Sequence, residues 1–384
     1  MIVGVPKESY PGERRVALVP SSVPELAKKG IEVLIEAGAG DQAGYPDAGF
    51  LEKGATVAKN RAQVFDSAQI LLQVRTLGAN PEAGQSDLPL LKQGTVVIGL
   101  LEPLTAREQV TALAGKGITT YGLELIPRIT RAQSMDVLSS QANIAGYKAA
   151  LFAANFIPRM FPMLMTAAGT ITAARVFVIG AGVAGLQAIS TCHRLGAVVQ
   201  AYDVRPAVKE QVQSVGARFV MLELESGEAE DAGGYAREMD EAFYKKQRDM
   251  MSRVVSGSDV VISTAMVPGK KAPVLITSDM VRAMPPGSVI VDLAAERGGN
   301  CELTRPGETI AHGGVTVVGP LNLPSEVPYH ASQMYAKNIS SFLLHLIRDG
   351  AVNPDDDDQI TRETIVTAGG RVVNARVKEA LNLA

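Results

Sequence analysis

Three glycines, Gly180, Gly182 and Gly185, form the pattern whose chemistry is easiest to interpret. They follow the short apolar run Arg175–Ile179 and open a helical pattern. In such a strand–turn–helix unit the first glycine permits a tight turn, the second lets the backbone approach a pyrophosphate, and the third allows close helix–strand packing. Amides at the start of the helix then meet the phosphate charge, and Val183 would lie against the nucleotide. The spacing therefore predicts a dinucleotide site.

Asp203 strengthens this prediction because it ends the next strand pattern, Val198–Tyr202, about 20 residues after the glycine turn. A carboxylate at that place accepts hydrogen bonds from the adenosine ribose, and its charge repels a 2′-phosphate. NAD(H) is therefore favoured over NADP(H). Arg205, two residues beyond with Val204 between, keeps NADP(H) as an alternative, since a nearby arginine accommodates that phosphate.

Short β-branched runs alternate with helical patterns along the N-terminal part of the chain. Such alternation predicts an α/β fold with a doubly wound parallel sheet. The predicted strands are Ile2–Val5, Glu32–Ile35, Gln69–Val74, Thr95–Leu100 and Thr119–Leu123, and the predicted helices are Ser21–Lys29, Asp47–Lys53, Arg61–Ser67 and Thr105–Gly115.

A second series of strands begins near Ala174, which predicts a second domain of the same class. Its strands are Arg175–Ile179, Val198–Tyr202, Val260–Ser263, Val289–Leu293 and Val315–Val318. Helical patterns precede and follow it, at 134–156 and 329–348. We therefore expect the second domain to be inserted into the first: residues 1–135 plus 330–384, and an NAD(H)-binding domain at 136–329.

Composition excludes several classes of function. The 384 residues include 37 Lys+Arg and 40 Asp+Glu, a net charge of −3, which gives no basic field for nucleic acid. Two cysteines make no disulfide framework, and a reducing compartment is favoured. No apolar run is long enough for a membrane span. No HExxH, CxxC, GxSxG or P-loop pattern occurs, so no metal site is predicted, and Asp355–Asp358 are expected to form a solvated loop.

Several motifs resemble the alanine dehydrogenase/nicotinamide nucleotide transhydrogenase superfamily in the same order. They cover the chain from Met1 to about Ser340, and the resemblance implies two Rossmann-like domains separated by a cleft. The matching segments are Val5-Pro6-Lys7-Glu8, Gly12–Leu18, the glycine turn, Pro268-Gly269-Lys270, and Pro286–Asp292 leading to Gly298-Gly299.

The resemblance also separates two branches of the superfamily. Alanine dehydrogenases carry a lysine and a histidine where this chain has Gln73-Val74-Arg75 and Leu101-Glu102-Pro103. Arg15, matching the arginine that binds the substrate carboxylate, remains. Arg75 stays protonated and cannot replace a titrating lysine. An amino-acid dehydrogenase using Arg15, Arg75 and Glu102 is therefore kept as an alternative, as is an NAD-binding regulatory module without catalysis.

Residues 128–141 closely resemble the signature of the NAD(H)-binding α1 component of proton-translocating, Re/Si-specific NAD(P) transhydrogenase. The resemblance implies that Arg128, Gln133, Asp136 and Ser139 hold and orient the nicotinamide, with Ile129, Thr130 and Arg131 also at the cofactor. The alternative interpretation makes these side chains helix caps and interdomain hydrogen bonds.

A stretch around 223–237 has no packing face and is predicted to be a mobile loop. By the same resemblance it closes over bound nucleotide, with Gly234 and Tyr235 near its tip. Gln247 and Met266 would line the adenosine side.

The resemblance further implies what this chain works with. NAD(H) binds to this chain, and NADP(H) binds to a partner subunit that receives the hydride. The chain would be a homodimer, held on the cytoplasmic side of the inner membrane by proton-conducting membrane subunits, and it carries no transmembrane segment of its own.

Overall fold

The computed structural model describes residues 1–384 apart from 222–240, 267–268, 349, 353–354, 356 and 384. The chain divides into two compact units, Met1–Gln141 with Ser325–Ala384, and Ala142–Pro324. These limits differ by a few residues from the boundaries expected from the sequence. The helix α5 (Val137–Phe156) runs through the first junction, so no turn or composition change marks that boundary.

The first unit is built on an eight-stranded sheet with the order β19-β18-β6-β5-β4-β1-β2-β3. The strands from β1 to β6 are mutually parallel. The C-terminal β18 pairs antiparallel with β6, and β19 pairs antiparallel with β18. Their bounds are β1 Ile2–Val5, β2 Glu32–Glu36, β3 Thr56–Ala58, β4 Ile70–Arg75, β5 Val96–Leu100, β6 Thr119–Gly122, β18 Ile365–Ala368 and β19 Arg371–Val372. The five predicted strands are confirmed. β3, β18 and β19 were not predicted, and β3 and β19 have only three and two residues.

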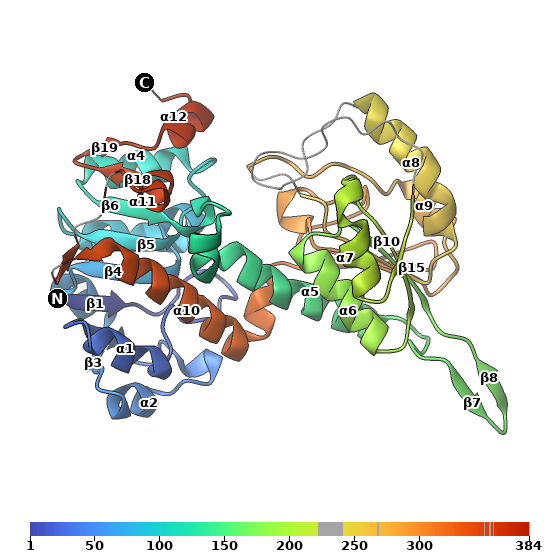
Figure 1. The fold of residues 1–384 in the computed structure, drawn as a ribbon, viewed down its shortest axis with the longest axis horizontal. Coiled ribbons are helices and arrows are strands. Elements are labelled where there is room, and N and C mark those ends of the chain that lie inside the picture. Colours follow the sequence, from blue (N-terminus) through green and yellow to red (C-terminus); the bar gives the residue numbers. More distant parts are fainter. Residues whose placement is uncertain (222–240, 267–268, 349, 353–354, 356, 384) are drawn as a thin grey trace. The chain divides into compact units, whose positions relative to one another are not determined.

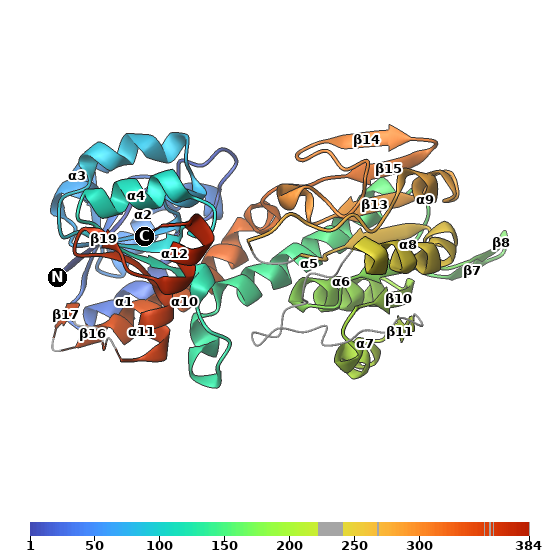
Figure 2. The ribbon, with the colours of Figure 1, turned by 90° about the horizontal axis from the view of Figure 1, so that it is seen from above.

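Helices cover both faces of this sheet, as the doubly wound prediction requires (Figure 2). One apolar core packs against α1 (Val23–Ala27), α2 (Asp47–Glu52), α10 (Pro328–Leu346) and α11 (Gln359–Thr364). The other core packs against α3 (Arg61–Ser67), α4 (Arg107–Gly115) and α12 (Ala375–Leu381). The long helix α10 fully buries Tyr335 and Phe342, so the C-terminal return is part of the core of this unit.

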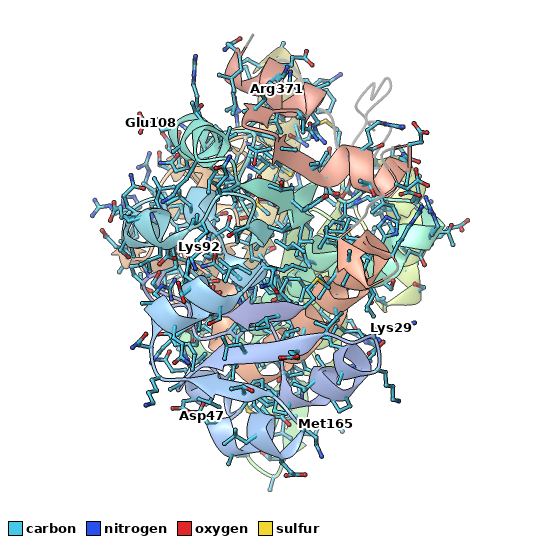
Figure 3. The ribbon with its side chains drawn as sticks, turned by 90° about the vertical axis from the view of Figure 1, so that its left-hand side faces the viewer. Lys29, Asp47, Lys92, Glu108, Met165 and Arg371 are labelled. Atoms are coloured by element: carbon cyan, nitrogen blue, oxygen red, sulfur yellow. The ribbon has the colours of Figure 1, made fainter. Side chains whose placement is uncertain are left out.

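The surface of the first unit carries charges of both signs. Lys29, Lys92 and Arg371 are interspersed with Asp47 and Glu108 around its periphery (Figure 3). This mixture agrees with the small net charge of the sequence.

The second unit has a seven-stranded sheet with the order β11-β10-β9-β12-β13-β15-β14, parallel except for β14. The five predicted strands are confirmed, while the edge strand β14 was not predicted. The bounds are β9 Arg175–Ile179, β10 Val198–Tyr202, β11 Arg218–Phe219, β12 Val260–Ser263, β13 Val289–Asp292, β14 Thr309–His312 and β15 Val315–Val318.

Helices flank this sheet on both faces as well. α5, α6 (Val183–Arg194) and α7 (Lys209–Ser214) pack on one face, and α8 (Glu241–Ser256) and α9 (Ser278–Arg282) on the other. In the described part of the chain, no helix is both long enough and apolar enough to cross a bilayer.

Two small antiparallel ribbons complete the fold. β7 (Leu164–Thr166) and β8 (Gly169–Ile171) form a hairpin that extends away from the rest of the second unit (Figure 1). All six of its strand residues are exposed. In the first unit, β16 (Ile347–Arg348) pairs with β17 (Ala351–Val352), so α10 ends at Leu346 rather than at the expected Arg348.

Candidate nucleotide-binding site

The glycine turn lies where the strand order of the second sheet reverses. After β9 the chain builds β10 and β11 on one side, and it then returns to place β12 on the other side of β9. Ligands of open α/β sheets bind at the carboxyl ends of the strands at such a switch point. Gly180 follows β9 there, and Thr264 to Met266 follow β12.

The three glycines meet three different requirements. Gly180 has a φ of 93°, and a Cβ on it would lie 2.5 Å from the Thr264 Oγ1. A Cβ on Gly185 would lie 1.9 Å from the Gly180 carbonyl oxygen, so the helix could not pack so closely on the turn. A Cβ on Gly182 would meet no atom within 4 Å. The fold therefore needs Gly180 and Gly185, while Gly182 leaves open space at the N-terminus of α6.

Asp203 joins the end of β10 to this turn. Its Oδ2 accepts a hydrogen bond from the Ala181 amide at 2.7 Å. The Arg205 guanidinium donates to both carboxylate oxygens, from Nε at 2.9 Å and from Nη2 at 3.0 Å, and the Arg205 amide donates at 2.9 Å. Asp203 is only 8% exposed. The structure thus brings Asp203 and Arg205 together as one ion pair beside the glycine turn, with the half-buried Val204 between them.

Gln247, on α8, lies beside the end of the same strand. Its Nε2 donates to the Tyr202 hydroxyl at 2.9 Å. The side chain is 3% exposed, and within the described residues its Oε1 is buried without a hydrogen-bond partner. Burial raises the pKa of the Tyr202 hydroxyl to about 12, and the Asp203 charge adds to the rise while the bond from Gln247 opposes it. Among the described residues, Gln247 therefore holds an unused acceptor close to the Tyr202 hydroxyl.

The remaining predicted residues of this site divide into two groups. Met266 lies in the turn that follows β12, here called the β12 turn (Thr264 to Met266), and it exposes 45% of its surface. Gly234 and Tyr235 lie outside the described residues, as does the whole loop expected around 223–237.

Two polar residues that sequence reasoning did not select hold the β12 turn. The Asn300 side chain accepts from the Ala265 amide at 3.0 Å and donates to the Ala265 carbonyl at 2.8 Å. The fully buried Asp292 accepts from the Asn300 amide at 2.7 Å and from the Ser263 hydroxyl at 2.9 Å. The sequence did carry a signal for these residues, because Asp292 ends the family-like segment Pro286–Asp292 and Asn300 directly follows Gly298-Gly299.

The second group of predicted residues lies in the first unit, on and around a 3₁₀ turn at Thr130–Met135 that precedes α5. Ala132 and Met135 are buried in the core. Arg128 and Gln133 point outward and are exposed, as are Thr130 and Arg131, while Ile129 is half-buried. Buried apolar residues therefore fix this turn to the core, while its polar side chains face outward.

Asp136 and Ser139 cap α5. The Asp136 carboxylate accepts from the Ser139 amide at 2.9 Å and from the Ser139 hydroxyl at 2.6 Å. A side chain before the first turn that satisfies a free amide is the usual N-cap arrangement. The helix-cap interpretation is thus confirmed for this pair, and a nicotinamide role for it stays a prediction.

A cluster of buried charges occupies the matching strand-order reversal of the first sheet. Arg15 donates to both Glu13 oxygens, at 2.7 Å and 2.6 Å, and to the Gln141 side chain at 2.9 Å. Burial alone would raise the pKa of Glu13, but the Arg15 charge outweighs it and lowers the pKa to about 2. Glu8 accepts from the Val74 amide at 2.6 Å, and burial beside Glu13 raises its pKa to about 8. Arg15 is therefore already bound to an internal carboxylate.

Glu102, at the position of the alanine dehydrogenase histidine, has a left-handed φ of 52°. Its amide donates to Oε1 of Glu124, which also accepts from the Leu101 amide at 2.8 Å. Burial and the Glu102 charge raise the pKa of Glu124 to about 7. Over the residues that the structure describes, no three His, Cys, Asp or Glu side chains gather as metal ligands.

Comparison with known proteins places both units in one family. The model of the alanine dehydrogenase/PNT N-terminal domain matches residues 4–145, and that of the C-terminal domain matches residues 149–375. A Rhodospirillum rubrum protein, named as the first portion of the α subunit of NAD(P) transhydrogenase, is 48% identical over 377 residues. That match covers 97% of this chain and 98% of the relative's own length.

Solved structures agree with the family match. A transhydrogenase from Sinorhizobium meliloti superposes with a TM-score of 0.86 at 45% identity, covering 97% of this chain and 100% of that one. An L-alanine dehydrogenase superposes with a TM-score of 0.82 at 25% identity, covering 100% of this chain and 99% of that one.

Proposed function

Because the chain belongs to the alanine dehydrogenase/PNT family over both of its domains, we propose that it is the NAD(H)-binding component of a proton-translocating NAD(P) transhydrogenase. The 48% identity to a transhydrogenase α subunit over nearly the full length of both chains favours this branch over the alanine dehydrogenases. The observation that carries NAD(H) binding is the open space over Gly182 beside the buried Asp203.

The residues of the second unit fit the adenosine and pyrophosphate half of NAD(H). The absence of a Cβ at Gly182 leaves room for a phosphate at the start of α6. Asp203 would accept from the ribose hydroxyls, which requires Arg205 to give up at least one of its bonds. The buried Oε1 of Gln247 offers an acceptor for a donor on the adenosine, and the exposed Met266 supplies apolar contact.

The polar turn of the first unit would hold the nicotinamide end. Bound NADH supplies the hydride, and the chain must orient it toward the acceptor. Hydride transfer between two nicotinamides moves no proton at the reacting carbons, so no protein acid or base is needed there. Orientation within roughly 3–3.5 Å and exclusion of water are what the protein contributes. Arg128, Gln133, Asp136 and Ser139 have the donors and acceptors for a carboxamide.

The geometry gives less support to an amino-acid dehydrogenase. Arg15 would have to exchange Glu13 for the substrate carboxylate, although it is 3% exposed and bound through both Glu13 oxygens. Arg75 also pairs with Glu13, at 3.3 Å.

The proposal includes partners for the chain. NADP(H) is held by a partner subunit, protons pass through membrane subunits, and the chain lies on the cytoplasmic side. A second copy of the chain pairs through the β7–β8 hairpin. That hairpin exposes Met163, Leu164, Met165 and Ile171, and an isolated two-stranded ribbon is only marginally stable in water.

Reconstitution tests the proposal directly. The chain is mixed with the membrane and NADP-binding components, and reduction of an NADP analogue by NADH is measured. We expect a rate well above that of the partners alone, and a lower rate for Gln133→Ala. No increase over the partners would refute the transhydrogenase role and favour a regulatory module. NADH oxidation by the isolated chain that depends on pyruvate and ammonia would instead favour the amino-acid dehydrogenase.

A further inference from the structure

We propose that Asp358 is a positioning residue for hydride transfer, because it fixes the nicotinamide-holding turn through Arg131. The inference rests on the proposed function, in which residues 128–139 orient the nicotinamide. It assigns Arg131 to Asp358 rather than to direct contact with the nucleotide. It also gives a role to the last member of the aspartate run.

The Asp358 carboxylate is itself rigidly held. It is the N-cap of α11, where Oδ1 accepts from the Ile360 amide at 2.8 Å and from the Thr361 amide at 3.4 Å. His345 of α10 places its Nε2 3.3 Å from the same oxygen. The side chain is only 10% exposed, so the expectation of a solvated loop is wrong at this position. Sequence could not show this, because the run itself does not reveal which member meets a helix start.

Arg131 attaches the turn to this fixed carboxylate. Its Nη1 lies 2.5 Å from the Asp358 Oδ2, while the arginine side chain is otherwise 58% exposed. A charge-assisted bond of this kind is short and directional. Because the arginine is exposed, the pair adds little to global stability. The Arg131–Asp358 ion pair therefore acts mainly on the position of the turn.

Other contacts hold the turn on either side of the exposed Gln133. Asn338 of α10 donates from Nδ2 to the Ser134 carbonyl at 2.8 Å. Ala132 and Met135 are buried, and Asp136 caps α5. Arg131 adds an ion pair on the N-terminal side of Gln133, next to the buried Ala132. Its loss would loosen that side of the turn while the other contacts persist.

The chain offers a matched control in the same aspartate run. Arg348 and Asp355 form an ion pair of the same residue types, at 3.1 Å, with both side chains about half exposed. Among the described residues, no hydrogen bond or ion pair joins this pair to the turn. Replacing Arg348 removes the same charge as replacing Arg131, but it leaves the Arg131–Asp358 ion pair intact.

The test compares Arg131→Met, Asp358→Asn and the double variant in the reconstituted complex. Asp358→Asn retains an acceptor for the α11 cap. We expect each single variant to lower kcat roughly tenfold, since small misplacements of a reacting group are costly. NADH affinity of the isolated chain, followed by nicotinamide fluorescence, should change less than about threefold. The double variant should lose no more than either single variant, because both remove one interaction.

Arg131→Lys should restore part of kcat, and Arg348→Met should leave it unchanged. Additive losses, or a loss of NADH affinity in Arg131→Met alone, would assign Arg131 to the nucleotide and overturn the inference. An equal loss in Arg348→Met would do the same. If Gln133→Ala lowers kcat while Arg131→Met does not, only the positioning role fails. If Gln133→Ala is also without effect, the nicotinamide assignment itself fails.

Discussion

The Arg205 guanidinium binds Asp203 through both carboxylate oxygens, at 2.9 Å and 3.0 Å, directly beside the glycine turn. The residue expected to exclude a 2′-phosphate is thus paired with the residue that could accept one. The choice between NAD(H) and NADP(H) depends on this pair, not on either residue alone.

Asp203→Ser tests that dependence. The serine keeps a small polar group but removes the charge and frees the Arg205 guanidinium. We expect NADH affinity to fall about tenfold, as for loss of a charged hydrogen bond, and NADPH affinity to rise relative to it. Fluorescence titration with both nucleotides measures the ratio of NADPH affinity to NADH affinity. Arg205→Leu is the control and should not gain NADPH binding. A ratio unaffected by Asp203→Ser would assign specificity to other residues.

Gly182→Ala and Gly185→Ala separate binding from folding. The Gly182 backbone, with φ −74°, accepts alanine, and its Cβ would enter the open space proposed for the pyrophosphate. We expect NADH affinity to fall at least about tenfold at unchanged thermal stability. Gly185→Ala drives its Cβ against the Gly180 carbonyl and should destabilise the chain by about 1–3 kcal/mol. NADH affinity of Gly182→Ala equal to wild type would place the phosphates elsewhere.

Asp136→Asn distinguishes a helix cap from a nicotinamide ligand. Asparagine still accepts the Ser139 amide but carries no charge. If Asp136 also orients the nicotinamide, hydride transfer in the reconstituted complex should fall by about tenfold while the melting temperature stays the same. Asp136→Ala removes the cap as well and should lose about 1 kcal/mol of stability. Wild-type turnover in Asp136→Asn would leave the residue with its capping role only.

The Glu124→Gln variant should differ in stability from the wild-type chain by an amount that depends on pH. The folded-state pKa of Glu124 is raised from 4.5 to about 7, so folding favours the protonated acid. The contribution of Glu124 to the free energy of unfolding is fully present below pH 4.5, and it is lost as the pH rises through about 7. Glutamine mimics the protonated form and keeps the acceptor for the Leu101 and Glu102 amides. Urea unfolding should show equal stability near pH 4.5, and a gain for the variant of at most about 3 kcal/mol at pH 8.5. A gain that does not change with pH would contradict the shift.

Met165→Asp tests the hairpin as a pairing surface. Met165 is 75% exposed, so the substitution should leave the fold intact. A charge on an apolar contact should shift the chain from dimer to monomer in sedimentation equilibrium at micromolar concentration. A dimer that survives Met165→Asp would place the contact on another surface.

Local chemistry made much of this protein predictable. The parallel strands are short apolar runs, and each is set by a few consecutive residues. The glycine turn could be assigned because Gly180, Gly182 and Gly185 act through their own backbone and the immediately following helix. Asp203 was predictable because its distance from the turn is fixed by one strand–helix–strand unit.

The partners of polar side chains were decided by the tertiary structure. A residue type states what a side chain can donate or accept, but not which distant group the fold brings to it. Arg131 meets Asp358 because the chain returns to the first unit after building the second. Asn300 meets Ala265 because β12 and β13 are neighbouring strands of one sheet. The sequence by itself determined the two doubly wound sheets and the site of the nucleotide turn. The tertiary structure decided that Arg131 pairs with Asp358 and that Asn338 holds the Ser134 carbonyl, since these groups lie far apart along the chain and only folding brings them together.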